Sequence, residues 1–246
     1  ICPFIPYNLV NYSMNIFNYF SYFDCAQQRF FILRLCSVTV LQFCFLSTQE
    51  CTAGDCIEGY GNYIYEDGSK YMGMFKESKK SGDGIFILPN GGKYIGNFEE
   101  DKMNGKGTFT FSNGSVYSGD FINGVSHGEG VFTFPDGAIY EGEFENGYQN
   151  GQGILILTNG IQFSGSFTNG VLNGTGTWQG ENDENYIGNF QNGSFHGQGT
   201  YLFPNGSKYV GEFHEGKKDG YGTFTFNNSS VDEKYVGEFK NDMFNG

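Results

Sequence analysis

Cysteine is missing from most of this 246-residue sequence, and glycine is missing from the remainder. All six cysteines lie at or before Cys56, whereas all 39 glycines lie at or after Gly54. Disulfide bonds therefore cannot cross-link the glycine-rich part, whose stability must come from packing. The two distributions divide the chain into an N-terminal segment, residues 1–55, and a glycine-rich region, residues 56–246.

Positive charge is also scarce, because no arginine follows residue 50 and no lysine lies between Lys106 and Lys208. With 14 Lys and Arg against 27 Asp and Glu, the formal net charge is −13. Proteins that bind nucleic acid need a basic face to neutralise phosphates. Docking on anionic lipid by charge has the same requirement. The composition therefore argues against nucleic acid and against membrane association through a basic patch.

One pattern recurs through the glycine-rich region, where Tyr-x-Gly-x-Phe repeats every 23 residues. Tyr71 and Tyr94 begin the first two copies, and Phe163 takes the tyrosine's place in the fifth. A Gly-x-Gly block follows at a fixed distance, usually with an aromatic residue two positions on, as in Gly105 to Phe109, and a dipeptide such as Asn113-Gly114 closes the copy. There are seven copies from residue 71, the last with a three-residue insertion, and a half copy at each end. Fixed periods of this length indicate a repeat array stabilised by contacts between neighbours.

The alternation of residues within each copy predicts β-strands. In residues 140–144 the aromatic residues fall on one face, and Glu141 and Glu143 fall on the other. Glycines on the aromatic face leave gaps where neighbouring rings lie flat. Asn-Gly and Asp-Gly favour type I′ turns, so each second block should pair with the next Tyr-x-Gly-x-Phe strand. We expect an all-β protein, an elongated single-layer antiparallel β-meander of tandem 23-residue hairpin repeats, roughly 75 Å long at about 4.8 Å per strand.

These motifs resemble the MORN (membrane occupation and recognition nexus) repeat family, whose motif combines Tyr-x-Gly-x-Phe, a linker glycine, Gly-x-Gly and Asp/Asn-Gly. The resemblance covers residues 59–246. The departures are local: Asn182-Asp183 replaces a turn dipeptide, and Ser78, Asp101 and Asp242 replace the linker glycine. We expect altered loops at these places.

Several chemical interpretations are disfavoured by spacing. The Gly-x-Gly blocks lead into strands, whereas a phosphate-binding loop leads into a helix. The three histidines, His127, His196 and His214, have no cysteine near them within the repeats, whereas a zinc site needs about four converging ligands. No serine or cysteine stands beside a plausible base. We therefore expect no catalytic, cofactor-binding or metal-binding residue.

The apolar stretch at residues 30–46 has several interpretations. It could be a short membrane segment, the apolar core of a signal peptide whose first residue is Met14, a stretch that is not truly coding, or an ordinary buried helix or strand. Because the sequence begins at Ile1 and stops within a repeat at Gly246, we also expect it to be a fragment of a longer protein or a gene model with wrong ends.

The resemblance implies a non-catalytic scaffold or protein-interaction module in the cytoplasm, associated with the cytoskeleton, cilia or membrane junctions. The alternative is the regulatory MORN region of a larger enzyme, phosphatidylinositol phosphate kinase-like or a SET-type lysine methyltransferase, with its catalytic domain outside this chain. We expect protein partners, and the exposed acidic residues Asp120, Glu141 and Glu143 favour basic ones. Unpaired strand edges predict a dimer or an end-to-end oligomer.

Overall fold

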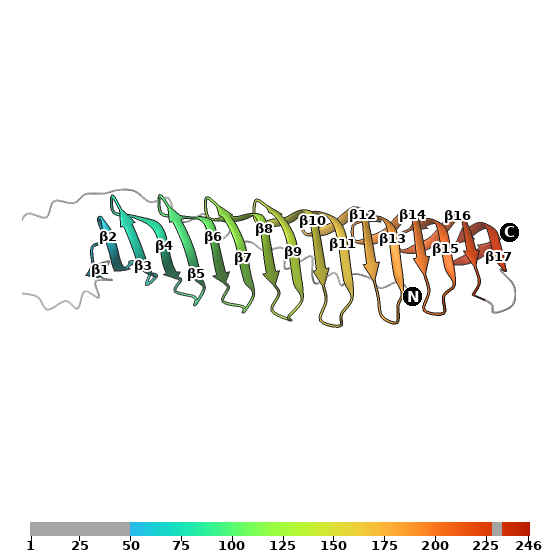
Figure 1. Cartoon of the computed structure of the whole chain (residues 1–246), viewed down its shortest axis with the longest axis horizontal. Helices are drawn as coiled ribbons and strands as arrows, with labels where there is room; N and C mark the ends of the chain where they lie inside the picture. Colours follow the sequence, from blue (N-terminus) through green and yellow to red (C-terminus); the bar gives the residue numbers. More distant parts are fainter. Residues whose placement is uncertain (1–49, 228–232) are drawn as a thin grey trace, which may run out of the picture.

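The computed structural model describes residues 50–227 and 233–246, and these form strands joined by turns (Figure 1). The strands are β1 Glu50–Gly54, β2 Gly59–Ile64, β3 Lys70–Lys76, β4 Lys79–Ile87, β5 Lys93–Glu99, β6 Lys102–Thr110, β7 Val116–Ile122, β8 Val125–Thr133, β9 Ile139–Glu145, β10 Tyr148–Ile156, β11 Gln162–Thr168, β12 Val171–Gln179, β13 Asn185–Gln191, β14 Ser194–Leu202, β15 Lys208–His214, β16 Lys217–Thr225, β17 Lys234–Lys240 and β18 Met243–Asn245.

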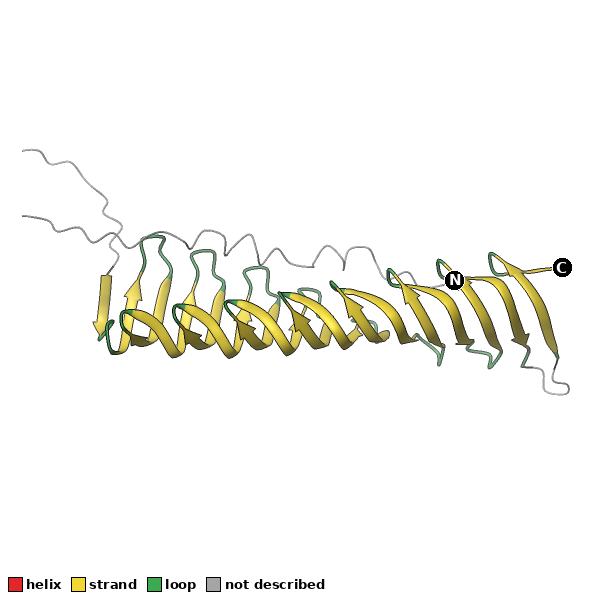
Figure 2. Cartoon of the chain, turned by 90° about the horizontal axis from the view of Figure 1, so that it is seen from above, coloured by secondary structure: helices red, strands yellow, loops and turns green. Residues whose placement is uncertain are grey.

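Each strand pairs antiparallel with the strand that follows it in sequence, from β1–β2 through β17–β18. Within the full repeats the register shifts between the two strands, as in β3–β4 and β5–β6, and the strands of the sheet are curved (Figure 2). The result is one long, open, single-layer meander, and this confirms the predicted fold class.

The core lies on one face of this sheet and consists of a ladder of aromatic rings. Tyr94 is fully buried, with its ring centroid 5.1 Å from that of Phe98 in the same repeat and 5.0 Å from that of Phe121 in the next. Both contacts are edge-to-face, a favourable geometry for aromatic pairs. The same arrangement recurs from Tyr71 to Tyr209 wherever the tyrosine is present, whereas the ring contacts of Tyr235 are to Phe239 and Phe244 of its own repeat. Because each tyrosine from Tyr71 to Tyr209 contacts two repeats, burial is shared between neighbours and the array stabilises itself along its length.

The turns that close the second blocks differ from the type I′ prediction. At Asn113-Gly114 only the glycine has a positive φ, 89°, and its amide donates to the carbonyl oxygen of Phe111 at 3.0 Å. A type I′ turn needs positive φ at both central residues. The predicted hairpin is present, but the predicted turn type is wrong, because the glycine is the fourth residue of the turn and not one of its two central residues.

Type I′ geometry occurs at the other end of the hairpins, within the linker of each repeat. Asn123 and Gly124 have φ values of 51° and 90° and join β7 to β8. At the departures from the linker glycine, Ser78, Asp101 and Asp242 adopt φ values of 63°, 69° and 70°. The prediction of altered loops at these three positions is therefore wrong, because Asp and Ser occupy the same left-handed conformation that glycine would.

The loop at Asn182-Asp183 does differ from its counterparts, as predicted. Both residues have positive φ, 53° and 64°, whereas in the equivalent turns only the glycine does. The amide of Glu184 donates to the carbonyl oxygen of Glu181 at 3.2 Å and closes this loop.

The N-terminal edge of the sheet is formed by β1, which lies in the N-terminal segment, residues 1–55, and pairs with β2. A disulfide bond between Cys51 and Cys56 ties β1 to the loop that precedes β2. The apolar stretch at residues 30–46 lies outside the described residues. Within residues 50–227 and 233–246, no helix is long and apolar enough to cross a membrane.

Candidate functional site

A continuous row of glycines crosses the sheet, one from each strand between β2 and β17. Successive members are direct cross-strand partners, for example Gly130 with Gly142 and Gly142 with Gly153. The row comprises Gly61, Gly73, Gly84, Gly96, Gly107, Gly119, Gly130, Gly142, Gly153, Gly165, Gly176, Gly188, Gly199, Gly211, Gly222 and Gly237.

On the aromatic face, a tyrosine ring covers each pair of glycines within a repeat. A Cβ atom added to Gly153 would overlap the ring and hydroxyl of Tyr140, which leaves no room for a larger residue. The Tyr140 hydroxyl donates a hydrogen bond to the carbonyl oxygen of Glu143 at 3.2 Å. This confirms that the glycines make space for rings, and it explains the constant Tyr-x-Gly spacing, because the ring must lie above the residue two positions on.

The fifth repeat departs from this arrangement because Phe163 has no hydroxyl. Around Gly165 and Gly176 the nearest side chains are Leu172 and Phe190, with no tyrosine ring above them. Gly165 has a φ of 143° and Gly142, in the fourth repeat, has one of 155°, both in a region that side-chain-bearing residues rarely adopt. The backbone of the glycine row is therefore distorted in the middle of the array.

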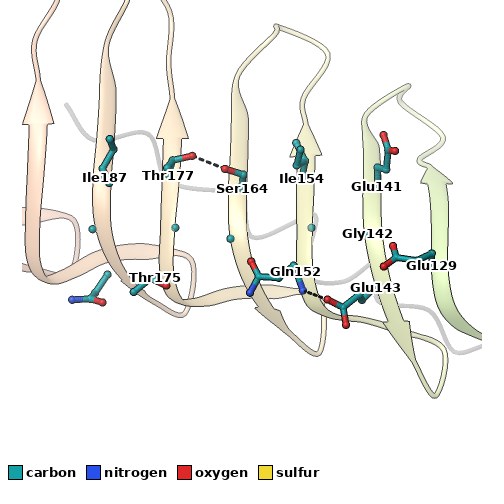
Figure 3. Close-up of a pocket in the computed structure, with 15 residues that line it drawn as sticks. Glu129, Glu141, Gly142, Glu143, Gln152, Ile154, Ser164, Thr175, Thr177 and Ile187 are labelled. Carbon is teal, nitrogen blue, oxygen red and sulfur yellow. Dashed lines mark hydrogen bonds between the residues drawn. The ribbon is translucent and has the colours of Figure 1, made fainter.

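On the opposite face the glycine row forms the floor of a shallow trough, and one hollow of this trough includes Gly165 and Gly176 (Figure 3). The hollow has a volume of about 760 Å³ and runs from β8 to β13. A second hollow of about 540 Å³ continues it toward β5 and shares Glu129 and Glu141 with it. We call the two hollows together the trough.

The residues next to the glycines on one side of the trough form what we call the aliphatic row. Most of their side chains are apolar or carry a hydroxyl group. Ile95, Ile154 and Ile187 are 47%, 43% and 58% exposed. Between them on neighbouring strands lie Ser164 and Thr177, whose hydroxyl oxygens are 2.5 Å apart. Isoleucines left in solvent on a face that the fold does not cover are candidates for contact with another molecule.

The other side of the trough, the polar row, carries Glu129 and Glu143, which are direct cross-strand partners. Glu141 lies across the glycine row from them, in the aliphatic row, where it faces Val131 and Ile154. A carboxylate oxygen of Glu143 accepts a hydrogen bond from the backbone amide of Gln152 at 2.8 Å. Of the predicted acidic residues, Glu141 and Glu143 are exposed in the trough, whereas Asp120 is half-buried and forms an ion pair with Lys106 at 2.8 Å.

The three histidines do not converge. His196 and His214 bring their ring centroids to 5.1 Å, whereas His127 lies on β8, six strands from His196 on β14. Among residues 50–227 and 233–246, no group of three or more His, Cys, Asp or Glu side chains is arranged to hold a metal ion. The trough therefore offers shape, apolar contact and negative charge, the properties of a binding surface.

Sequence reasoning found the acidic residues and missed the trough. The available signal was the regular spacing of the glycines of the row, which alternates between 12 and 11 residues from Gly61 to Gly222. That signal becomes a row only when the register is known, and the register includes shifts such as the one between Gly73 and Phe75 that the 23-residue period does not reveal.

The family model of the MORN repeat matches nine segments of the chain: residues 57–70, 71–93, 94–116, 117–139, 140–162, 163–183, 186–208, 209–231 and 235–246. These agree with seven full copies and a half copy at each end. Among curated proteins, a search finds no similar sequence.

Two solved structures give weak likenesses. The TCP10 domain of Danio rerio CPAP, in complex with a peptide of Danio rerio STIL, is 15% identical with a TM-score of 0.43, over 68% of this chain and 73% of that one. The TCP domain of Drosophila melanogaster SAS-4, in complex with a proline-rich motif of Ana2, is 10% identical with a TM-score of 0.44, over 74% of this chain and 99% of that one. At these TM-scores neither likeness carries an inference about this chain.

Proposed function

Because the chain belongs to the MORN repeat family, we propose that it is a non-catalytic scaffold that holds protein partners along the trough. The observation that carries this proposal is the row of exposed isoleucines beside an open hollow of about 760 Å³. A meander of this length offers one continuous surface, and contacts spread along it give affinity without a deep pocket.

The finer features of the proposal rest on the family resemblance and on charge. The scaffold acts in the cytoplasm, at the cytoskeleton, in cilia or at membrane junctions, and its partners are basic because the exposed trough carboxylates are negative. Fluorescence microscopy of the tagged full chain in the cells that express it tests the location. A uniform distribution without any such structure would contradict it.

We also propose self-association as a dimer or an end-to-end oligomer. Among the described strands, β1 and β18 each pair on one side only, and free strand edges invite pairing. Light scattering over a range of concentrations tests this, and a strict monomer at high concentration would contradict it.

Direct binding tests the scaffold function. Proteins captured by the full chain from its own cells would be purified, and each would be titrated calorimetrically against the parent and against Ile154→Arg/Thr177→Trp, which blocks the trough. At least one should bind the parent directly and lose affinity for the blocked variant. If no purified protein binds, or if all bind both equally, the trough is not a protein-binding surface.

A further inference from the structure

Three carboxylates, those of Glu129, Glu141 and Glu143, occupy one end of the larger hollow, and we call them the carboxylate seat (Figure 3). They belong to β8 and β9 and flank the paired glycines Gly130 and Gly142. All three residues are exposed. None takes part in the ion pairs found among the described residues, and the lysine that lines the trough, Lys106, already pairs with Asp120.

The carboxylate seat works against the stability of the sheet. Glu129 and Glu143 are directly opposite each other, and like charges at opposing positions of an antiparallel pair are destabilising. A cation placed among them from outside would remove this repulsion and gain complementary attraction at the same time.

Next to the carboxylates lies an apolar seat, the part of the hollow above Gly165 and Gly176. Ile154 and Ile187 bound it, and the short side chains of Ser164 and Thr177 leave it open between them. The two isoleucines lie on β10 and β13, with β11 and β12 between them. A large apolar side chain inserted here would lie over Ser164 and Thr177, between the two isoleucines, and would shield apolar surface of the seat from water.

The width of the trough determines whether a bound polypeptide is helical or extended. Its two sides are residues on either side of each glycine, so they are about 7 Å apart along the strands, because a strand rises about 3.4 Å per residue. A helix with side chains is about 10 Å or more across and would rest on the rim. An extended chain lying across the strands fits between the sides.

We propose, building on the scaffold function above, that the trough takes an extended segment of a partner protein with two anchors. An arginine or lysine occupies the carboxylate seat, and a large aliphatic or aromatic side chain occupies the apolar seat. The seats lie two to three strands apart, about 10–14 Å at about 4.8 Å per strand. An extended chain covers that distance in about three or four residues, so the anchors are separated by that spacing in the partner's sequence.

Random linear peptides displayed on phage, selected on the immobilised full chain, provide the probe. Selected peptides should carry a basic residue three or four positions from a large apolar one. Synthetic copies of them should bind more weakly as salt rises, because exposed charges are screened over about 8–10 Å. Selection of no peptides, or of peptides without a basic residue, would overturn the proposal.

Two sets of variants locate the binding. Glu129→Gln/Glu141→Gln/Glu143→Gln should weaken the selected peptides by about tenfold or more, since each neutralised carboxylate removes part of the attraction. Thr177→Trp, which fills the apolar seat on an exposed strand position that tolerates aromatics, should weaken them as well. The matched control, Glu212→Gln/Glu215→Gln/Glu238→Gln, makes the same change of net charge outside the hollows and should leave affinity within about twofold, because distant exposed charges are screened.

The outcomes separate this inference from the scaffold function. If peptides bind but respond equally to both triple variants, the two seats are wrong, while a scaffold that binds elsewhere stands. If the peptides behave as expected but no natural protein binds the trough directly, the binding preferences of the two seats are supported and the scaffold function is contradicted.

Discussion

Glu129 on β8 and Glu143 on β9 face each other directly across the antiparallel register, and neither forms an ion pair with a described lysine. The neighbouring pair, Lys106 with Asp120, shows that the same position on the sheet accommodates opposite charges. Two carboxylates at a position where an ion pair fits lower the stability of the folded protein. Binding of a cation between them would offset this loss.

Replacing one of these carboxylates should therefore stabilise the protein. Glu129→Lys should raise the free energy of unfolding by about 0.2–1 kcal/mol, because an attractive cross-strand pair replaces a repulsive one. Urea denaturation measures this. Glu238→Lys serves as a control, because Glu238 faces the uncharged Tyr221 and has no like charge to relieve. A loss of stability in Glu129→Lys would mean that the carboxylates do not repel each other.

The glycine row should not tolerate a methyl group. Gly153→Ala should lower the free energy of unfolding by about 1–3 kcal/mol, because the added Cβ atom overlaps the Tyr140 ring and an overpacked site must shift its neighbours. Gly92→Ala is the matched control, because there the nearest atoms belong to the Asn90 and Leu88 side chains, which can move. Equal effects of the two substitutions would show that the ring contact does not set the requirement for glycine.

The two faces of the sheet should respond differently to truncation. Phe144→Ala should cost about 3–5 kcal/mol, because the ring is buried between Tyr117 and Tyr140 at 4.8 and 5.3 Å. Ile187→Ala, on the exposed face, should change stability by only about 0.5 kcal/mol. Denaturation midpoints compare the two variants, and an unchanged midpoint for Phe144→Ala would mean that the faces are assigned the wrong way round.

Ionisation of the buried tyrosines should limit stability at alkaline pH. Burial raises the pKa of Tyr94 and of Tyr209 from 10.0 to about 12. The unfolded chain therefore loses these phenol protons at lower pH than the folded chain, so the stability they contribute is complete below pH 10 and is lost as the pH rises toward 12. Denaturation midpoints measured across this window should fall, and less so in Tyr94→Phe. Midpoints that stay constant up to pH 12 would contradict the burial of the phenols.

The sequence predicted those features that depend on alternation and period. Tyr140 and Phe144 share a face because side chains alternate along a strand, and the 23-residue period repeats that face in every copy. In repeats such as residues 117–139 both turns contain a glycine dipeptide, Asn123-Gly124 and Asp136-Gly137, so composition did not show which turn is type I′. Only the backbone conformation shows that the type I′ turn is the one at Asn123-Gly124.

Other features depend on neighbours that lie a repeat away. Lys80 is a charged residue on the aromatic face, and its ammonium group lies 5.0 Å from the centre of the Tyr65 ring and 3.4 Å from a carboxylate oxygen of Asp101. Its burial depends on both of these contacts, which join separate repeats. The trough is of the same kind, since each of its sides takes residues from the strands of several repeats.

A partner protein bound to the chain gives the most direct test of the trough as the binding face. A photo-crosslinking amino acid would be placed at Thr175, which lines the trough, and in a second protein at Ser112, in a hairpin turn. Cross-linking to a purified partner should be efficient from Thr175 and weak from Ser112, and should fall at Thr175 when the seat carboxylates are replaced by glutamine. Efficient cross-linking from Ser112 together with none from Thr175 would show that partners bind at the edge of the meander and that the trough is not the functional surface.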